Sequence, residues 1–325
     1  MSKDEAGFLR RVKYVVEYAS LRVTAWVFQS MPEPLAVFCG RMLGRFFWLT
    51  GAKRRRIARR NVQKAMPGEL TGKEITRLLK KTAIHIGLNT VEAFWAKKRL
   101  RKEDLEGRFP MEGFELLKEA VDSGRGVICF SSHIGNWQRF GAFQAVCLGG
   151  FSAPIRPATN PLIRKYMTRL RNEFQIEELS THAGVRPMVG ALRRGRLLVI
   201  LIDQHARAGY TEATFFGRKA ATTSVVAALG VRLNVPVFAA YSLRDGFTFR
   251  HRGYIQGPLE LIRTGDRDAD ARANTQLFND MVEEPIRQHP EQWFGWLYPR
   301  WKLADRLERK QKKASEQAAP SSPES

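Results

Sequence analysis

The stretch that decides the fold is Gly126-Val127-Ile128-Cys129-Phe130-Ser131-Ser132-His133-Ile134-Gly135-Asn136-Trp137-Gln138. Its apolar first half is typical of a buried β-strand, and a helix-compatible run begins shortly after the histidine. A strand, a turn and a helix in this order place the His133 imidazole at the carboxyl end of the strand. Open α/β sheets usually carry their chemistry at that end. His133 is therefore the first candidate for a reactive group.

Strand-like and helix-like segments alternate through the rest of the chain. Residues 197–202 are apolar throughout, as strands buried on both faces are. Alternation of this kind predicts an α/β fold, with a mostly parallel twisted sheet covered by helices on both faces. Thr71 and Glu74 predict a capping box at the start of an earlier helix. The expected strands are 127–130, 151–155, 176–179, 197–202, 237–243 and 247–254, and the expected helices between and after them are 113–123, 136–148, 161–174, 185–194, 223–233 and 270–289.

The first 64 residues combine basic and aromatic side chains. They carry fourteen Lys or Arg against four Asp or Glu. Residues 8–65 are predicted to form helices that break at the Pro32-Glu33-Pro34 segment and near Gly51. Basic amphipathic helices with bulky apolar side chains suit the headgroup region of a membrane. The alternative is that these helices pack on the rest of the protein with a solvated basic face. Whether residues 14–31 span a membrane or lie on it stays open.

Composition divides the chain into three regions. Residues 1–65 are expected to form basic, aromatic, membrane-associating helices. Residues 66–303 are expected to hold the α/β domain. Residues 304–325 are charged and then rich in Ser, Pro and Ala, which predicts a disordered tail.

The formal net charge of the chain is +22. A charge of this size indicates an anionic partner: nucleic acid, an anionic bilayer or a phosphorylated substrate. The sequence contains no helix-turn-helix, RNP or zinc-finger pattern, so we expect no nucleic-acid partner. The histidines and cysteines show no metal-ligand spacing, so we expect no metal site.

Four segments carry a family pattern in a fixed order. They are Ser132-His133-Ile134-Gly135-Asn136-Trp137; Arg156-Pro157-Ala158-Thr159-Asn160-Pro161-Leu162; Leu201-Ile202-Asp203-Gln204 with Phe215-Phe216-Gly217; and His289-Pro290-Glu291-Gln292-Trp293-Phe294-Gly295-Trp296-Leu297 with Arg300-Trp301-Lys302. Together they resemble the bacterial lipid A late acyltransferase family, the lauroyl and myristoyl transferases. The resemblance covers roughly residues 10–303. It departs at Gln138, where the family's H-x-x-x-x-[D/E] motif has a carboxylate.

The resemblance implies a glycerolipid acyltransferase-like fold and an enzyme at the cytoplasmic face of the bacterial inner membrane. Such an enzyme moves a fatty acyl chain from acyl carrier protein to a hydroxyl of a lipid A precursor. The implied attachment is peripheral or monotopic, or through a single N-terminal anchor. The implied partners are acyl carrier protein, a phosphorylated glycolipid acceptor and anionic inner-membrane lipids. We expect a monomer with no cofactor beyond the acyl donor, which is acyl-acyl carrier protein or acyl-CoA.

Two alternatives stay open. Mycobacterial acyltransferases that act on mannosylated phosphatidylinositol share the histidine motif, so another membrane glycolipid can be the acceptor. A catalytically silent relative that binds lipid or acyl donor is the second alternative, and Gln138 motivates it. The sequence determines neither the acyl chain length nor the acceptor hydroxyl.

The proposed chemistry needs a base to take the proton of the attacking hydroxyl. Neutral imidazole suits that step, so we assign His133 as the general base. A carboxylate normally orients such a ring and stabilises the imidazolium. Gln138 can fold back toward His133 and accept a hydrogen bond, but it carries no charge. We therefore predict that Gln138 impairs catalysis.

The remaining candidates lie downstream of the histidine. An arginine can hold a phosphate through two parallel hydrogen bonds or stabilise an oxyanion. We take Arg171 as a catalytic candidate. The candidate substrate-binding residues are Arg156, Asn160, Arg169, Asp203 and Asn136. Asp203 can instead support the site or cap a loop, and Asn136 can cap the helix that follows it.

Overall fold

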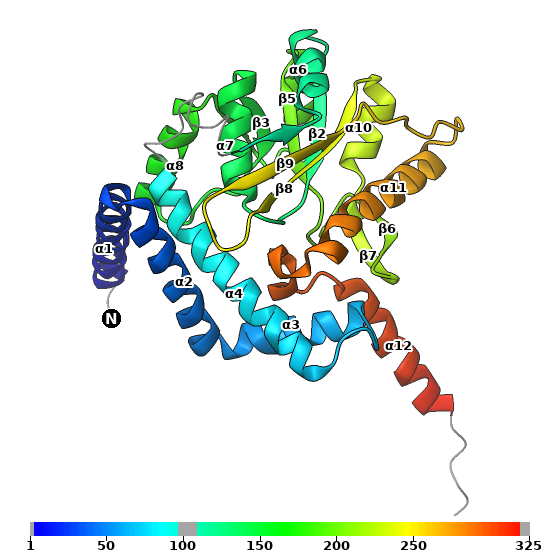
Figure 1. The fold of residues 1–325 in the computed structure, drawn as a ribbon. Helices are drawn as coiled ribbons and strands as arrows, with labels where there is room; N and C mark the ends of the chain where they lie inside the picture. Colours follow the sequence, from blue (N-terminus) through cyan, green and yellow to red (C-terminus); the bar gives the residue numbers. More distant parts are fainter. Residues whose placement is uncertain (1–2, 97–108, 319–325) are drawn as a thin grey trace, which may run out of the picture.

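The structure, a computed structural model, describes residues 3–96 and 109–318, and its centre is one sheet (Figure 1). In these residues the sheet has seven strands in the order β1-β9-β8-β2-β5-β3-β4. Every neighbouring pair is parallel except β8 and β9, which confirms the mostly parallel α/β prediction. The strands are β1 (Met111–Glu112), β2 (Val127–Ser131), β3 (Phe151–Pro154), β4 (Ile176–Leu179), β5 (Leu197–Leu201), β8 (Val237–Arg244) and β9 (His251–Gln256).

Helices cover both faces of this sheet. Successive residues of β2 enter different cores: Ile128 and Phe130 pack with α9, α10 and α11, whereas Val127 and Cys129 pack with α6 and α7. Burial on both faces explains why the strand is apolar throughout. The helices are α1 (Lys3–Ser30), α2 (Glu33–Thr50), α3 (Ala52–Ala65), α4 (Gly72–Trp95), α6 (Phe114–Asp122), α7 (Trp137–Leu148), α8 (Pro161–Glu173), α9 (Arg186–Arg193), α10 (Val225–Leu233), α11 (Arg267–Gln288) and α12 (Lys302–Ala318), with the 3-10 turns η2 (Pro290–Gln292) and η3 (Phe294–Leu297).

The N-terminal helices lie along one side of the molecule (Figure 1). Their breaks fall at Pro32 and Gly51, as predicted, and Thr71 and Glu74 form the predicted capping box. Helix α3 contributes Ala58 to the core beneath the sheet, so it shares that core with the α/β domain. In the part of the chain that the structure describes, no helix has both the length and the apolar character needed to cross a membrane.

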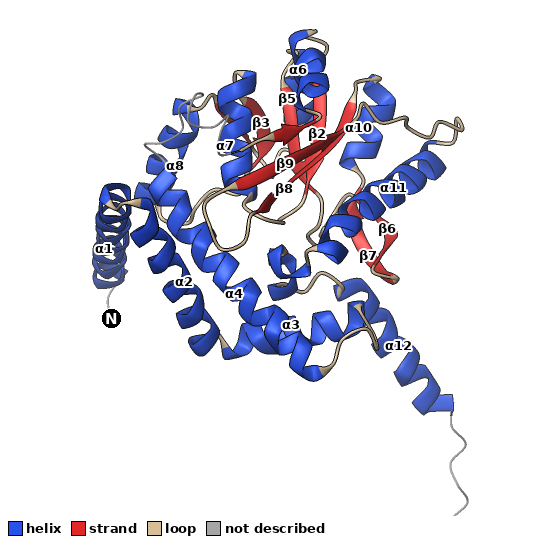
Figure 2. Cartoon of the chain, in the orientation of Figure 1, coloured by secondary structure: helices blue, strands red, loops and turns tan. Residues whose placement is uncertain are grey.

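The sequence prediction missed a small antiparallel hairpin formed by β6 (Tyr210–Phe215) and β7 (Arg218–Thr223). Figure 2 shows the hairpin as a separate pair of strands beside α11. Asn279 of α11 holds it, because its amide donates to the Thr214 carbonyl at 2.9 Å. A residue on a distant helix therefore fixes these strands, and local sequence carries little sign of it. The last main strand was also placed too early, since it begins at His251.

The predicted disordered tail is corrected over its first part. Residues 304–318 belong to helix α12, and the last seven positions of the expected tail lie outside the described residues. Two carboxylates anchor the helix: Lys64 lies 2.8 Å from Asp305 and 2.7 Å from Glu308. Arg218 pairs with the same two carboxylates. The expected domain boundary at residue 304 thus falls inside a helix bound to α3 and β7.

Close packing of α2 on α4 depends on glycine. A Cβ added at Gly87 would lie 2.3 Å from the Gly40 carbonyl oxygen, which real contacts do not allow. We expect Gly87→Ala to lower the free energy of unfolding by about 2 kcal/mol, as overpacking does. Gly190→Ala is the matched control, because the nearest atom there is the mobile Arg194 Nη1 at 3.4 Å. Urea denaturation measures both, and equal stability of the two variants would contradict the prediction.

Candidate active site

His133 stands in the turn between β2 and α7. The Asn136 side chain caps α7, accepting from the Arg139 backbone N–H at 3.1 Å. Gly135 has φ +59°, and a Cβ there would lie 2.0 Å from the Ser242 carbonyl oxygen. A side chain would meet both backbone strain and a backbone clash, so the turn requires glycine. The turn is thus held between the sheet and the start of the helix.

The partner of His133 is Asp203. Ser131 of β2 pairs in register with Leu201 of β5, so the residues two positions beyond each come together. His133 Nδ1 lies 2.7 Å from Asp203 Oδ1, and the His133 backbone N–H donates to Oδ2 at 2.9 Å. Trp293 Nε1 donates to the same Oδ2 at 2.7 Å. One buried carboxylate therefore holds the ring, the backbone and an indole together.

This carboxylate is ionised in the resting site. Burial raises the pKa of Asp203, but the attraction of the His133 ring and the hydrogen bonds from His133 and Trp293 outweigh burial and leave the pKa below its ordinary value. A carboxylate on Nδ1 fixes the tautomer whose Nε2 is unprotonated. His133 Nε2 lies 3.2 Å from the amide nitrogen of Gln204. With Nδ1 on Asp203, Nε2 is the ring nitrogen that faces the Gln204 amide.

Gln138 does not occupy the place expected for it. It is exposed at the second position of α7, and in the described part of the chain no hydrogen bond joins it to His133. The carboxylate that we expected at position 138 is supplied by Asp203, which we had placed with the substrate-binding residues. The orienting contact comes from the loop after β5, seventy residues downstream, so local spacing could not reveal it.

A cationic cavity of about 640 Å³ adjoins Asp203 and Gln204. Its basic lining residues are Arg156, Arg164, Arg207, Arg300 and Lys302, together with His182 and His205. Asp203 is the one acidic residue among those that line it, and that carboxylate already binds His133. The cavity can therefore accept an anionic group such as a phosphate. Of the three arginines predicted from sequence, Arg156 lines this cavity.

The other two predicted arginines lie outside the cavity lining. Arg169 is exposed and pairs with Glu173 at 3.7 Å. Arg171, our catalytic candidate, pairs with Glu178 at 2.6 Å. Neither lines the cavity, and the arginine of α8 that does is Arg164, near the start of the same helix. The helix phase, which the sequence alone did not orient, decides which arginine faces inward.

Both predicted asparagines, Asn160 and Asn136, form hydrogen bonds with other residues of the protein. Asn160 accepts from the backbone N–H groups of Leu162 and Ile163, and its amide donates to α1 at Tyr14 O and Glu17. Asn136 caps α7, and its amide donates to Glu92 at 2.9 Å. The capping role that the sequence offered for Asn136 is therefore present, and Asn160 caps α8 in the same way. They position helices that border the site.

Arg300 belongs to the fourth sequence motif, but the sequence by itself assigned it no role. It is buried, and one of its Nη atoms donates to the carbonyls of Gln204 at 3.0 Å and Ala221 at 2.7 Å. Burial lowers its pKa to about 10, although Asp203 opposes the shift. The guanidinium therefore ties the loop after β5 to the hairpin strand β7.

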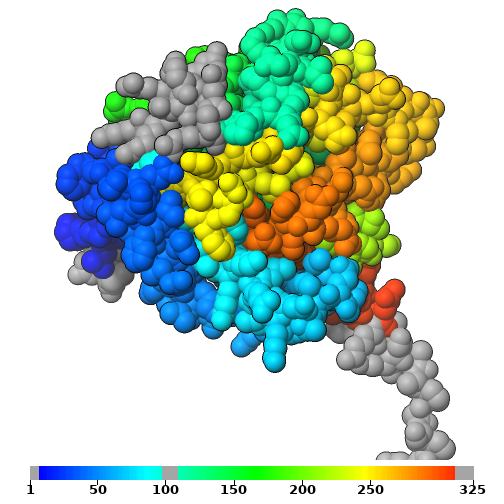
Figure 3. Space-filling model, in the orientation of Figure 1, coloured from blue at the N-terminus to red at the C-terminus, as the bar shows by residue number. Residues whose placement is uncertain are grey.

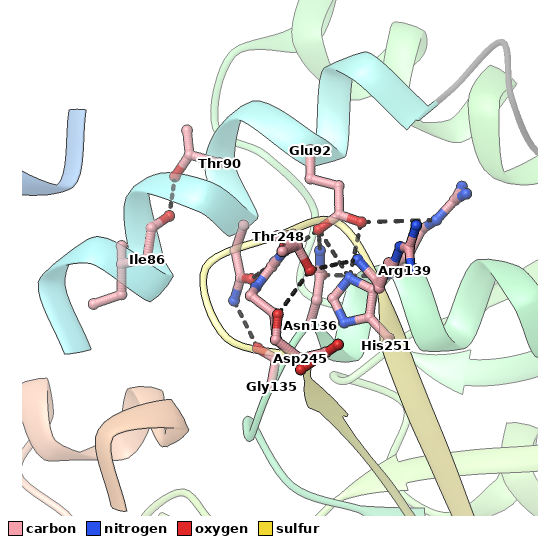
Figure 4. A network of polar contacts seen from close by, with 12 residues as sticks. Ile86, Thr90, Glu92, Gly135, Asn136, Arg139, Asp245, Thr248 and His251 are labelled. Atoms are coloured by element: carbon pink, nitrogen blue, oxygen red, sulfur yellow. Dashed lines mark hydrogen bonds and ion pairs between the residues drawn. The ribbon is translucent and has the colours of Figure 1, made fainter. Parts of the chain in front are cut away.

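A second buried network lies behind the histidine turn (Figure 4). Glu92 of α4 is its centre: Arg244 lies 2.7 Å away and His251 2.9 Å away. Asn89, one turn earlier on α4, donates to the Gly135 carbonyl at 2.7 Å. With the contact from Asn136, two residues of the turn are bound to α4 through this network. No short motif linked these residues, because they come from four separate elements.

Burial and charge act against each other at Glu92. Burial raises its pKa, but the attraction of His251 and Arg244 dominates and lowers it to about 2. Among residues 3–96 and 109–318, no group of His, Cys, Asp and Glu side chains is arranged to hold a metal ion. The network is therefore an ion-paired support for the turn.

Comparison with known proteins places similar sequences over nearly the whole chain. The model of the family described as bacterial lipid A biosynthesis acyltransferase matches residues 5–303. The lipid A biosynthesis palmitoleoyltransferase of Escherichia coli (strain K12) is 26% identical over 283 residues, which cover 85% of this chain and 88% of that protein. The lipid A biosynthesis acyltransferase of Shigella flexneri matches with the same values. The phosphatidylinositol mannoside acyltransferase of Mycolicibacterium smegmatis (strain ATCC 700084 / mc(2)155) is 23% identical over 193 residues, 58% of this chain and 60% of that protein.

The Glu92 network predicts a large stability loss. Glu92→Gln leaves the Arg244 and His251 side chains buried without their anion, so we expect unfolding to become easier by about 3–5 kcal/mol. Because the folded pKa of Glu92 is lowered from 4.5 to about 2, its stabilisation is present above pH 4.5 and is lost as pH falls toward 2. Urea melts at pH 6 and pH 3 measure both effects, and the variant should lose part of this pH dependence.

The control is Glu177→Gln, which breaks an ion pair with Arg194 in which the two side chains are 39% and 56% exposed. It should change stability by less than about 1 kcal/mol. A Glu92→Gln variant as stable as this control would show that the buried charges are not coupled as described.

Proposed function

Because the chain belongs to the bacterial lipid A biosynthesis acyltransferase family and is an O-acyltransferase, we propose that it moves a fatty acyl chain from acyl carrier protein to a hydroxyl of a lipid A precursor. The observation that carries the proposal is the His133–Asp203 pair beside a cationic cavity. The pair supplies a base, and the cavity supplies cations for a phosphorylated acceptor.

In this proposal His133 acts as the general base. Its neutral Nε2 takes the proton of the acceptor hydroxyl while the oxygen attacks the thioester carbonyl carbon. The tetrahedral intermediate then collapses: the C–S bond breaks, and the leaving thiolate takes the proton from the imidazolium. Asp203 stabilises the positive ring between the two steps. No covalent acyl-enzyme is needed.

The position of the Gln204 amide gives it a role in the proposed acyl transfer. It lies where the acceptor hydroxyl must reach His133 Nε2, so the hydroxyl displaces it. The displaced N–H donors are then next to the reacting carbonyl and can stabilise its developing negative charge. This role replaces the oxyanion contact expected of Arg171.

The cationic cavity suits a phosphorylated glycolipid. Arg156 lies in the segment between β3 and α8, Arg164 lies in the first turn of α8, and both line the cavity. Guanidinium groups bind phosphate through two parallel hydrogen bonds. Acyl-CoA is an alternative donor, because it is anionic as well.

The N-terminal helices suit an anionic membrane surface. Large apolar side chains on α1 and α2 are exposed, including Phe8 and Trp26 at 67% each. Basic residues lie between them, a combination typical of helices in the headgroup region. We propose peripheral attachment to the inner membrane at its cytoplasmic face, where acyl carrier protein is the donor.

A second acceptor is favoured by one comparison. The mycobacterial relative is a phosphatidylinositol mannoside acyltransferase, so a mannosylated phospholipid is the alternative acceptor. Both acceptors carry a phosphate, so the cationic cavity suits either. Parallel assays with a tetra-acylated lipid A precursor and with a phosphatidylinositol mannoside distinguish them.

Position 203, rather than 138, should control the transfer rate. Asp203→Asn should lower kcat by about 10³–10⁴-fold, as the equivalent change does in a serine protease triad. His133→Ala should abolish transfer. Gln138→Glu should change kcat by less than about threefold, because Asp203 already orients the ring. Transfer from lauroyl-acyl carrier protein to a tetra-acylated lipid A precursor in detergent micelles measures all three.

Glu178→Gln is the matched control, since it removes a carboxylate that pairs with Arg171 outside the cavity. A chain that gains activity only with Gln138→Glu would instead support the disabled-enzyme reading from sequence. If no variant transferred an acyl group to either acceptor, a non-catalytic lipid-binding role would be favoured.

The cavity arginines should affect acceptor binding. Arg164→Gln should raise KM for the phosphorylated acceptor by about tenfold with kcat little changed, because a charged hydrogen bond to phosphate is lost. Arg169→Gln, on the same helix but outside the cavity, is the control. With a dephosphorylated acceptor the difference between the two variants should disappear. An equal effect of both variants would contradict phosphate binding in the cavity.

A further inference from the structure

A second, apolar pocket lies where α2 meets α3. It has a volume of about 210 Å³ and is lined mainly by the apolar residues Phe47, Trp48, Ala58, Leu79, Ala83, Ile86 and Leu297, with Thr50, Gly51, Arg54 and Arg55 completing it. We call it the α2–α3 pocket. It is smaller than the ~300–1,000 Å³ typical of sites for drug-sized ligands, so it suits a narrow chain better than a ring system.

The pocket is separate from the cationic cavity. Leu297 lines the pocket, whereas the next residue, Tyr298, lines the cavity. Arg54 closes the wall between them: it donates to the Leu297 carbonyl at 3.1 Å and lies over the Tyr298 ring at 4.8 Å. A ligand in the α2–α3 pocket therefore does not occupy the space next to His133.

Positive charge is crowded beside this pocket. Lys53, Arg54, Arg55 and Arg56 follow Ala52 at the start of α3, a helix that contains no acidic residue. Among residues 3–96 and 109–318, no carboxylate lies within ion-pair distance of these four side chains. The positive end of the helix dipole adds to the repulsion. An anion bound at this turn would relieve it.

Exposed apolar side chains surround the same place. Phe46 and Leu49, at the end of α2, are 56% and 72% exposed. Trp48, between them, lines the pocket and has Arg55 over its ring at 5.2 Å and Lys80 at 6.0 Å. Figure 3 shows α3 and the start of α4 as one continuous part of the surface, in cyan. Apolar and cationic groups thus share one patch.

We propose that the α2–α3 pocket binds one acyl chain of an anionic phospholipid, with the lipid phosphate on Arg54 and Arg55. The apolar lining accounts for the chain. Arg54 donates to the Leu297 carbonyl and Arg55 to the Leu49 carbonyl, but neither has a carboxylate partner among the described residues, which accounts for the anionic headgroup. The occupant is a lipid of the bilayer on which the protein rests, distinct from the acyl group that is transferred. Binding at this pocket does not require acyl transfer, so it can be tested separately.

The probe is dioctanoyl-phosphatidylglycerol below its micelle concentration, titrated calorimetrically into the full chain. Saturable binding of one lipid is expected. Glycerophosphoglycerol, which lacks the chains, and dioctanoyl-phosphatidylcholine, which lacks net charge, should bind at least about tenfold more weakly. Ala83→Phe, which fills the pocket, should weaken binding about tenfold or more, because buried methylenes are displaced. Arg54→Gln should weaken it about fivefold.

Matched controls separate this site from general effects. Arg232→Gln removes an exposed arginine on α10, far from the pocket, and should leave binding unchanged. His133→Ala should also bind the lipid normally, whatever its transfer activity. Trp48 gives an independent readout: phosphatidylglycerol with brominated chains should quench its fluorescence, and Trp48→Phe should remove the saturable part of the quenching.

Three results would overturn the proposal. The first is equal affinity for the charged and uncharged lipids. The second is unchanged binding in an Ala83→Phe variant that keeps the wild-type melting temperature. The third is a result in which the unchanged protein binds no lipid and Arg54→Gln loses binding to acyl carrier protein. That result would make the patch a protein-docking surface.

Discussion

The hydrogen bond between the His133 ring and the buried Asp203 carboxylate is the interaction on which the site depends. It requires β2 and β5 to be neighbours in parallel register, since only then do the residues that follow both strands meet. It also requires Trp293, whose indole satisfies the second carboxylate oxygen. A buried carboxylate with these three donors keeps its charge in an apolar setting. The order of the strands and the C-terminal segment that contains Trp293 thus both position the Asp203 carboxylate.

The turn that carries His133 is held from two sides. Asp203 and Trp293 hold it from the sheet and the C-terminal segment, and the Glu92 network holds it from α4. Buried ion pairs of this kind are weak contributors to net stability, because desolvation offsets their attraction. Their breaking is costly all the same, so they restrict the turn to one arrangement. We infer that the network contributes more to the geometry of the site than to the overall stability of the fold.

The large positive charge is distributed between two places with different surroundings. In the cationic cavity, arginines line a space beside Asp203 and Gln204, which suits a phosphorylated acceptor. At the start of α3, arginines border an apolar pocket and exposed apolar side chains, which suits a lipid. The bulk charge predicted anionic partners. The residues around each cluster of arginines distinguish a site for the phosphorylated acceptor from a site for a lipid.

The sequence by itself determined most of the main elements and the place of His133 after β2. The apolar run before His133, the helix breaks at Pro32 and Gly51 and the capping box at Thr71 are local signals, and each is found where it was expected. The family resemblance likewise rested on short contiguous motifs. Local physics sets such features, because propensity, periodicity and capping act over a few residues.

Tertiary structure decided which side chains meet. It paired His133 with Asp203 instead of position 138, and it turned Arg164 rather than Arg171 toward the cavity. It also held the β6–β7 hairpin and α12 through contacts with α11 and α3. Strand register, helix phase and long-range ion pairs determine these contacts. They depend on residues far apart in the chain, which no local pattern of the sequence encodes.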